Sequence, residues 1–141
     1  MNALFCVILT FVVQLAHSQF DESQYDYVGL KGSKLILVSK NDKFGFVNHQ
    51  GKIKIPLIYD AAWDFSFGLA AVKQKDKWGF INEKGKVAIP FRYDYADYFS
   101  EKIAPIKYNN QWYHIDKKGN IVRKILVDET IPTYDLFEIK D

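Results

Sequence analysis

The stretch Trp78-Gly79-Phe80-Ile81-Asn82 decides the fold, because its opening recurs 34 residues earlier as Phe44-Gly45-Phe46. Trp112 follows Trp78 by the same step, which also relates many other positions. These positions are Gly51, Gly85 and Gly119; Tyr59-Asp60 and Tyr93-Asp94; Pro56 and Pro90; and Phe65-Ser66 and Phe99-Ser100. Since this register needs no insertion, the sequence predicts a tandem array of 34-residue units, the pattern of a repeat protein.

Within one unit the local signals are those of β structure. In the second unit apolar runs begin at Leu69, Trp78 and Val87, and the rings of Trp78 and Phe80 share one face of a strand. Residues that tolerate positive φ predict a two-residue hairpin after the first run: Asn41-Asp42, Lys75-Asp76 and Asn109-Asn110. Segments 48–51, 82–85 and 116–119 begin with Asn or Asp and end with Gly, which favours a type I turn with a bulge. Each unit is therefore predicted to be a three-stranded antiparallel meander.

The segments between units carry an Asp followed by small residues, as in Asp60-Ala61-Ala62. Because Asp can cap a helical turn, we expect a turn of 3₁₀ or α helix there. Pro56 and Pro90 cannot donate a ladder hydrogen bond, which predicts a strand edge or a bulge at each. Gly79 is expected to leave room beside Trp78 and Phe80.

A single meander cannot bury both of its faces, so the units are expected to stack on one another. Three units are few for a closed propeller, which favours an all-β, open, twisted array; a propeller-like or assembled ring is the alternative. The predicted boundaries are a partial leading repeat at 19–33, repeat 1 at 34–68, repeat 2 at 69–102, a degenerate repeat 3 at 103–136 and a closing strand at 137–141.

The first 18 residues differ from the rest, because they carry no Asp, Glu, Lys or Arg. The run from Ala3 to Val13 is apolar apart from Thr10, and Ala16-His17-Ser18 has the small-x-small pattern of a signal-peptidase site. We therefore expect residues 1–18 to be a signal peptide cleaved between Ser18 and Gln19, with the chain exported to the periplasm or the outside. The run is too short to span a membrane, so no transmembrane segment is expected in the mature chain.

The net charge of +2 is small and both signs are interspersed. A nucleic-acid partner is not expected, since such proteins usually carry a clustered basic excess. The single cysteine lies within the predicted signal peptide, so the mature chain is expected to be stable without disulfides.

The repeated residues resemble the WG-repeat family of bacterial proteins over roughly residues 34–128. The resemblance is carried by Lys77-Trp78-Gly79-Phe80-Ile81, Gly85-Lys86, Ile89-Pro90, Tyr93-Asp94 and Phe99-Ser100. The first unit has Phe44 in place of Trp, and the third has Tyr113 and His114 in place of Gly and Phe. The family is common among exported proteins, and the resemblance brings no catalytic residues with it.

The periodic residues are interpreted as structural, because a catalytic group is needed once whereas a structural residue is needed in every unit. They are Phe44, Gly45, Gly51, Asp60, Trp78, Gly79, Gly85, Asp94, Trp112 and Gly119, with Asp128 as the third Asp of its series. His49 is expected to be solvated, and His114 to be partly buried with a polar partner. Neither has a second ligand at metal-binding spacing, so no metal and no cofactor are predicted.

Residues that break the repeat are the candidates for specific function. They are Trp63, Phe67, Arg92, Tyr98 and Tyr108, whose counterparts in the neighbouring unit differ in kind. The leading hypothesis is an exported, non-enzymatic module that binds a protein or a cell-envelope glycan. The alternatives are a purely structural or truncated array and, less favoured, a small hydrolase that uses a pair of carboxylates.

Overall fold

The computed structural model of the chain describes residues 20–126. The predicted signal peptide, Asp128 and the predicted closing strand at 137–141 lie outside the described residues. Within the described residues, the 3₁₀ turn η1 (Glu22–Gln24) precedes the strands. Asp21 caps this turn by accepting a hydrogen bond from the Ser23 backbone N–H.

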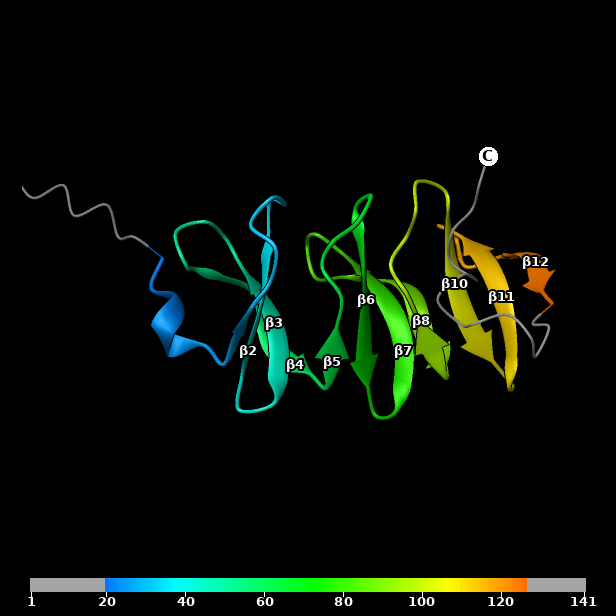
Figure 1. Ribbon diagram of the computed structural model, residues 1–141, viewed down its shortest axis with the longest axis horizontal. Coiled ribbons are helices and arrows are strands. Elements are labelled where there is room, and N and C mark those ends of the chain that lie inside the picture. The colour runs from blue at the N-terminus through cyan, green and yellow to red at the C-terminus, as the bar shows by residue number, and fades with distance from the viewer. Residues whose placement is uncertain (1–19, 127–141) are drawn as a thin grey trace, which may run out of the picture.

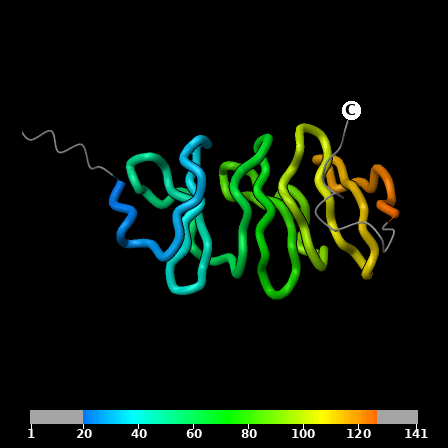
Figure 2. The backbone as a smooth tube through the Cα atoms, viewed as in Figure 1, coloured from blue at the N-terminus to red at the C-terminus, as the bar shows by residue number. Residues whose placement is uncertain are grey.

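Over residues 20–126, three four-stranded antiparallel sheets follow one another along the long axis (Figure 1). The first sheet contains β1 (Tyr27–Val28), β2 (Ile36–Lys40), β3 (Lys43–Val47) and β4 (Ile53–Tyr59). The second contains β5 (Ala61–Ala62), β6 (Leu69–Gln74), β7 (Lys77–Asn82) and β8 (Val87–Tyr93). The third contains β9 (Tyr95–Ala96), β10 (Ile103–Tyr108), β11 (Gln111–Asp116) and β12 (Ile121–Ile125). No strand pairing joins one described sheet to another, so residues 20–126 form an open array, as predicted (Figure 2).

The segments between units are extended, and the expectation of a helical turn there is wrong. Ala61 pairs with Lys73, and Ala62 pairs with Val72, so the connector adds a short fourth strand to the three predicted for the second sheet. β9 does the same in the third sheet. The reason is that Asp60 caps a different element. Its carboxylate accepts the backbone N–H of Lys75, in the hairpin turn of the next unit, at 3.2 Å.

The two turns of each meander form as the sequence predicts. Asn41 and Asp42 have φ values of 51° and 58°, and the equivalent residues of the other two hairpins are also positive. In the second kind of turn, Asn48 Oδ1 accepts backbone hydrogen bonds from Gln50 and Lys52 at 3.0 and 2.9 Å. Gly51 closes that turn with a φ of 77°. These contacts recur 34 and 68 residues later.

The core lies between the sheets, because each strand sends alternate side chains to opposite faces. In the second sheet Ala70, Val72 and Ile81 pack toward the first sheet. Ala71, Phe80 and Ile89 of the same sheet pack toward the third. The outer face of the first sheet is covered by Phe20 and Tyr25, which precede the sheet, and by Val28 of β1.

Gly79 is required by a close approach of backbone rather than by the neighbouring rings. A Cβ atom at this position would lie 2.7 Å from the Ile89 carbonyl oxygen and 3.0 Å from the Pro90 carbonyl carbon. The approach arises from the predicted bulge at Pro90. Between the pairs Phe80↔Ile89 and Trp78↔Tyr93, β8 holds two more residues than β7. Gly45 meets Ile55 and Pro56 in the same way.

Candidate functional site

The periodic Asp residues tie each connector to the hairpins of the units before and after it. Asp94 accepts a hydrogen bond from Lys77 Nζ at 2.5 Å, and Asp60 does so from Lys43. This lysine hydrogen bond is the main reason that the pKa of each carboxyl lies below its usual value. Asp26 caps the first hairpin through the Asn41 backbone N–H at 2.7 Å. These contacts explain the repetition of Asp as a structural requirement.

Trp78, which the sequence analysis interprets as a structural residue, is a core residue that is 7% exposed. Its ring packs against Tyr95 with centroids 5.5 Å apart, and the Tyr95 ring also contacts Trp112 at 5.7 Å. Trp78 therefore helps to join the second sheet to the third, and Trp112 packs on the same tyrosine within the third sheet.

Three of the five repeat-breaking residues lie on the connectors. Trp63 and Phe67 belong to the loop between β5 and β6, and Tyr98 belongs to the loop between β9 and β10. The two loops are joined, because Ser66 Oγ donates to the Phe99 carbonyl at 2.7 Å. Trp63 Nε1 donates to the Ala96 carbonyl at 3.1 Å. Phe67 and Tyr98 remain more than half exposed.

The other two repeat-breaking residues are engaged within the fold. The Arg92 guanidinium donates to the Gly119 carbonyl oxygen and to the Tyr93 hydroxyl, each at 3.1 Å. Tyr108 packs edge-on against Tyr93 with ring centroids 6.1 Å apart. Arg92 thus links β8 to the last turn of the third sheet. Neither Arg92 nor Tyr108 lines the pocket beside Phe67.

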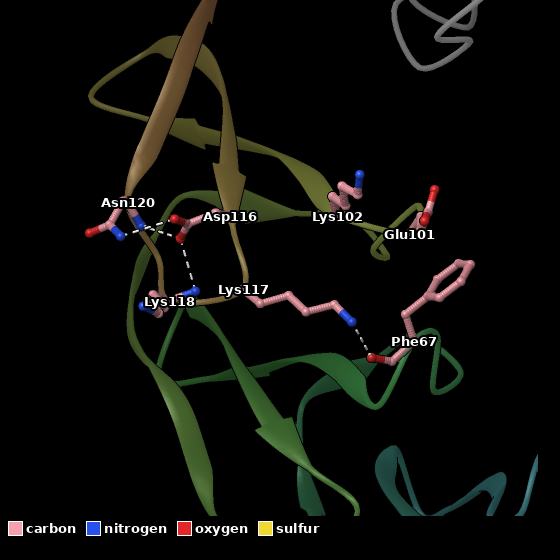
Figure 3. A pocket seen from close by; sticks show the side chains of 7 residues that line it. All are labelled: Phe67, Glu101, Lys102, Asp116, Lys117, Lys118 and Asn120. Carbon is pink, nitrogen blue, oxygen red and sulfur yellow. Dashed lines mark hydrogen bonds between the residues drawn. The ribbon is translucent and has the colours of Figure 1, made fainter. Parts of the chain in front are cut away.

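A pocket of about 530 Å³ opens beside Phe67 (Figure 3). Phe67, Glu101 and Lys102 line it from the two connectors, and the turn between β11 and β12, from Asp116 to Asn120, supplies the rest. Lys117 Nζ extends across to the Phe67 carbonyl oxygen at 2.9 Å and lies 5.7 Å from the centroid of the Phe67 ring. We call this site the Phe67 pocket.

The pocket exists because the repeat changes at two positions. At the equivalent place between the first and second sheets, Lys34 forms an ion pair with Glu83 at 3.3 Å. One unit later the residue corresponding to Lys34 is Gly68, and the residue corresponding to Glu83 is Lys117. A Cβ atom on Gly68 would meet nothing within 4 Å. The loss of one side chain and the reversal of a charge therefore leave open a site that is bridged in the preceding unit.

The pocket is lined by more cations than available anions. Lys102, Lys117 and Lys118 line it, together with the carboxylates of Glu101 and Asp116. Asp116 is committed to its own turn, where its oxygens accept hydrogen bonds from Asn120 and the Lys118 backbone N–H. The hydrogen bond from the Asn120 side chain is the main cause of the lowered pKa of Asp116.

Sequence reasoning identified Phe67 but missed the three lysines of the pocket. The signal that identifies two of them is a change of charge at aligned positions, with Lys117 in place of Glu83 and Lys102 in place of Gly68. This change of charge is not seen when only the aromatic residues of neighbouring units are compared.

Other ionisable groups are partly buried away from the pocket. Burial raises the pKa of Asp64 and of Asp97. Asp64 accepts a hydrogen bond from the Leu30 backbone N–H at 3.2 Å, and Asp97 accepts one from Tyr98 at 2.8 Å. Over residues 20–126, no group of three His, Cys, Asp or Glu side chains is placed to hold a metal ion.

His114 has the expected polar partner but is buried more fully than expected, with 3% of its surface exposed. Arg123 donates its Nε–H to His114 Nδ1 at 3.0 Å. Burial lowers the pKa of His114, and the nearby Arg123 charge lowers it further. His49 is exposed, with Nε2 2.9 Å from the Ser33 carbonyl oxygen.

Comparison with protein families finds a match to the WG containing repeat at residues 44–78 and again at residues 78–112. Each match begins at the aromatic residue that precedes the close backbone approach and ends at the equivalent residue of the next unit. No curated protein matches the chain. In the described part of the chain, no helix is long and apolar enough to cross a membrane.

Proposed function

Because the chain is a member of the WG containing repeat family over residues 44–112, we propose that it is an exported, non-enzymatic binding module. Its partner is a cell-envelope glycan or a protein, which contacts the connector loops. Export rests on the uncharged, apolar N-terminal stretch and the Ala16-His17-Ser18 cleavage pattern. A rigid array that presents variable loops is a common arrangement for recognition.

The observation that carries this proposal is the exposure of Phe67 and Tyr98 on two loops that are hydrogen-bonded to each other. The side chains of the regular positions pack in the core or form the turns, so they build the scaffold. The exposed side chains of Phe67 and Tyr98 have no equivalent structural duty, and large exposed aromatic side chains favour contact with a partner.

The test is capture by the purified mature chain, residues 19–141, in a glycan array and in a pull-down from envelope fractions. Tyr98→Asn and Phe67→Asn are expected to reduce capture. Ile58→Thr is the matched control, because Ile58 is 48% exposed but lies on β4 rather than on a connector. Capture that both loop variants leave unchanged contradicts the proposed binding face.

A purely structural array is the second candidate. It is favoured by Trp63 and Arg92, whose hydrogen bonds to Ala96 and Gly119 hold neighbouring units together. Two results support this candidate. The wild-type mature chain captures nothing from either source, and its Trp63→Phe variant unfolds at a lower temperature than the wild type.

The non-enzymatic part of the proposal has its own test. Envelope glycans are incubated with the wild-type chain and with Asp64→Asn and Asp97→Asn, which change the two carboxyl groups whose pKa is raised by burial. Product formation by the wild type that either substitution abolishes overturns the assignment and favours a hydrolase.

A further inference from the structure

The Phe67 pocket combines two features that point to one kind of ligand. The first is a set of three lysines, Lys102, Lys117 and Lys118, among the residues that line it. Lys117 has one donor committed to the Phe67 carbonyl oxygen, and an ammonium carries three donors, so it retains capacity to bind an anion. Of the two carboxylates that line the pocket, Asp116 is held by its own turn. Only the Glu101 carboxylate is therefore available to oppose the binding of an anion.

The second feature is the exposed ring of Phe67. The side chain is 58% exposed, and its backbone has a φ of 49°. Positive φ is rare for a bulky residue and costs free energy that Asn or Gly at the same position avoids. The aromatic ring is therefore held at the pocket against the local backbone preference, although it contributes little to the core.

The two features lie within reach of one ligand. Lys117 Nζ is 5.7 Å from the ring centroid (Figure 3), so a group stacked on the ring lies beside an ammonium. The volume of about 530 Å³ falls in the range of small-ligand sites. An inorganic anion uses the lysines and leaves the ring unused, whereas a neutral sugar uses the ring and leaves the lysines unused.

Resting on the binding role proposed above, we infer that the Phe67 pocket binds an acidic sugar of a glycan chain, with its carboxylate on Lys117 and its apolar C–H face on the Phe67 ring. Lys102 and Lys118 flank the site and add to the attraction. The pocket accommodates one sugar unit, and neighbouring units of the glycan continue over the connector loops.

The experiment is calorimetric titration of the mature chain with a trisaccharide of galacturonic acid. A trisaccharide of galactose and inorganic phosphate serve as comparison ligands. We expect the acidic trisaccharide to bind at least tenfold more tightly than either comparison ligand, and its affinity to fall as salt is added. Lys117→Gln and Phe67→Asn are each expected to weaken binding by tenfold or more.

Two controls separate loss of the site from loss of the fold. Lys84→Gln removes the lysine that corresponds to Lys118 in the preceding unit, and binding is expected to be unchanged. Phe67→Asn is expected to unfold at or above the wild-type temperature, because Asn tolerates positive φ. A loss of binding in that variant then reflects the ring alone.

Three results overturn the inference. They are absence of binding of the acidic trisaccharide to the wild type, equal binding of phosphate or of the neutral trisaccharide, and unchanged binding by Phe67→Asn. If capture in the glycan array or the pull-down still depends on Tyr98 in such a case, the proposed binding function stands and only the ligand class is wrong. If the acidic trisaccharide does not bind and capture does not depend on Tyr98 either, the proposed binding function fails as well.

Discussion

Replacing Gly79 by Val tests the physical reason for the Trp-Gly pair that defines the repeat. The added Cβ meets backbone atoms of β8 at 2.7 to 3.0 Å, and backbone cannot rotate away as a flexible side chain can. Gly79 itself is buried, so the strands must separate or the bulge at Pro90 must change. Overpacking of this kind costs about 2 kcal/mol, which corresponds to a fall in Tm of roughly 10 °C in a domain of this size.

Thermal unfolding of the mature chain, followed by circular dichroism, measures the effect. Gly79→Ala is expected to show most of the loss, because the Cβ atom alone makes the close contacts. Gly32→Ala is the matched control, since a Cβ there would meet nothing within 4 Å and its φ is not in the left-handed region. That control is expected to leave Tm unchanged or to raise it slightly.

The third sheet supplies a more demanding form of the test. There Tyr113 replaces the glycine and Lys124 replaces the proline, and the strands pair regularly as Trp112↔Ile125, Tyr113↔Lys124 and His114↔Arg123. The double variant Gly79→Tyr/Pro90→Lys should therefore be less destabilised than the sum of its single changes, by about 1 kcal/mol or more. An unchanged Tm in Gly79→Val, or strict additivity in the double variant, refutes the reasoning.

Three further outcomes are expected. Asp94→Asn should lose stability chiefly at neutral pH. The Lys77 hydrogen bond lowers the pKa of Asp94 in the folded chain, so its contribution is present above the usual value near 3.8 and is lost as pH falls through the folded value. The Tm curves of wild type and variant should converge in acid, while Asp76→Asn, at a side chain that is 97% exposed, should follow the wild type throughout. Burial lowers the pKa of His114, so the wild type should lose stability as pH drops below about 6.5 toward the folded value; His114→Gln should lack this loss, and a persistent slope contradicts it. Finally, N-terminal sequencing of the exported chain should begin at Gln19, and recovery of Met1 on exported material contradicts the predicted cleavage.

The elements predicted from the sequence are those that depend on local chemistry. Asn41 and Asp42 tolerate positive φ, and Gly51 permits the left-handed end of the second turn, so hairpins and strands follow from residues a few positions apart. The short strands β5 and β9 were not predicted, because their pairing depends on hairpins ten or more residues away. Asp60 was assigned to the wrong element for the same reason, since it caps Lys75, 15 residues onward.

The candidate site was predicted in part. Phe67 was identified because it breaks the repeat, and Tyr98 was identified on the adjoining loop. Arg92 breaks the repeat equally but bonds to Gly119 within the fold, so irregularity alone does not separate contact residues from local structural ones. The pocket itself depends on an absent side chain at Gly68 and on the reach of Lys117 across 50 residues of sequence, neither of which a single aligned position reveals.

The departures of the third unit occur in compensating pairs, which argues against simple decay of the repeat. Tyr113 and Lys124 change together and remove a bulge that Tyr113 could not tolerate. His114 and Arg123 replace the apolar pair of Phe80 and Ile89 and bond to each other at 3.0 Å. Because Ile115 packs toward the second sheet, its neighbour His114 points to the opposite face, where exposed Arg123 adds a charge. The third sheet therefore keeps the strand pairing of the repeat, while the face away from the second sheet gains a polar pair in which His114 is buried and Arg123 is exposed.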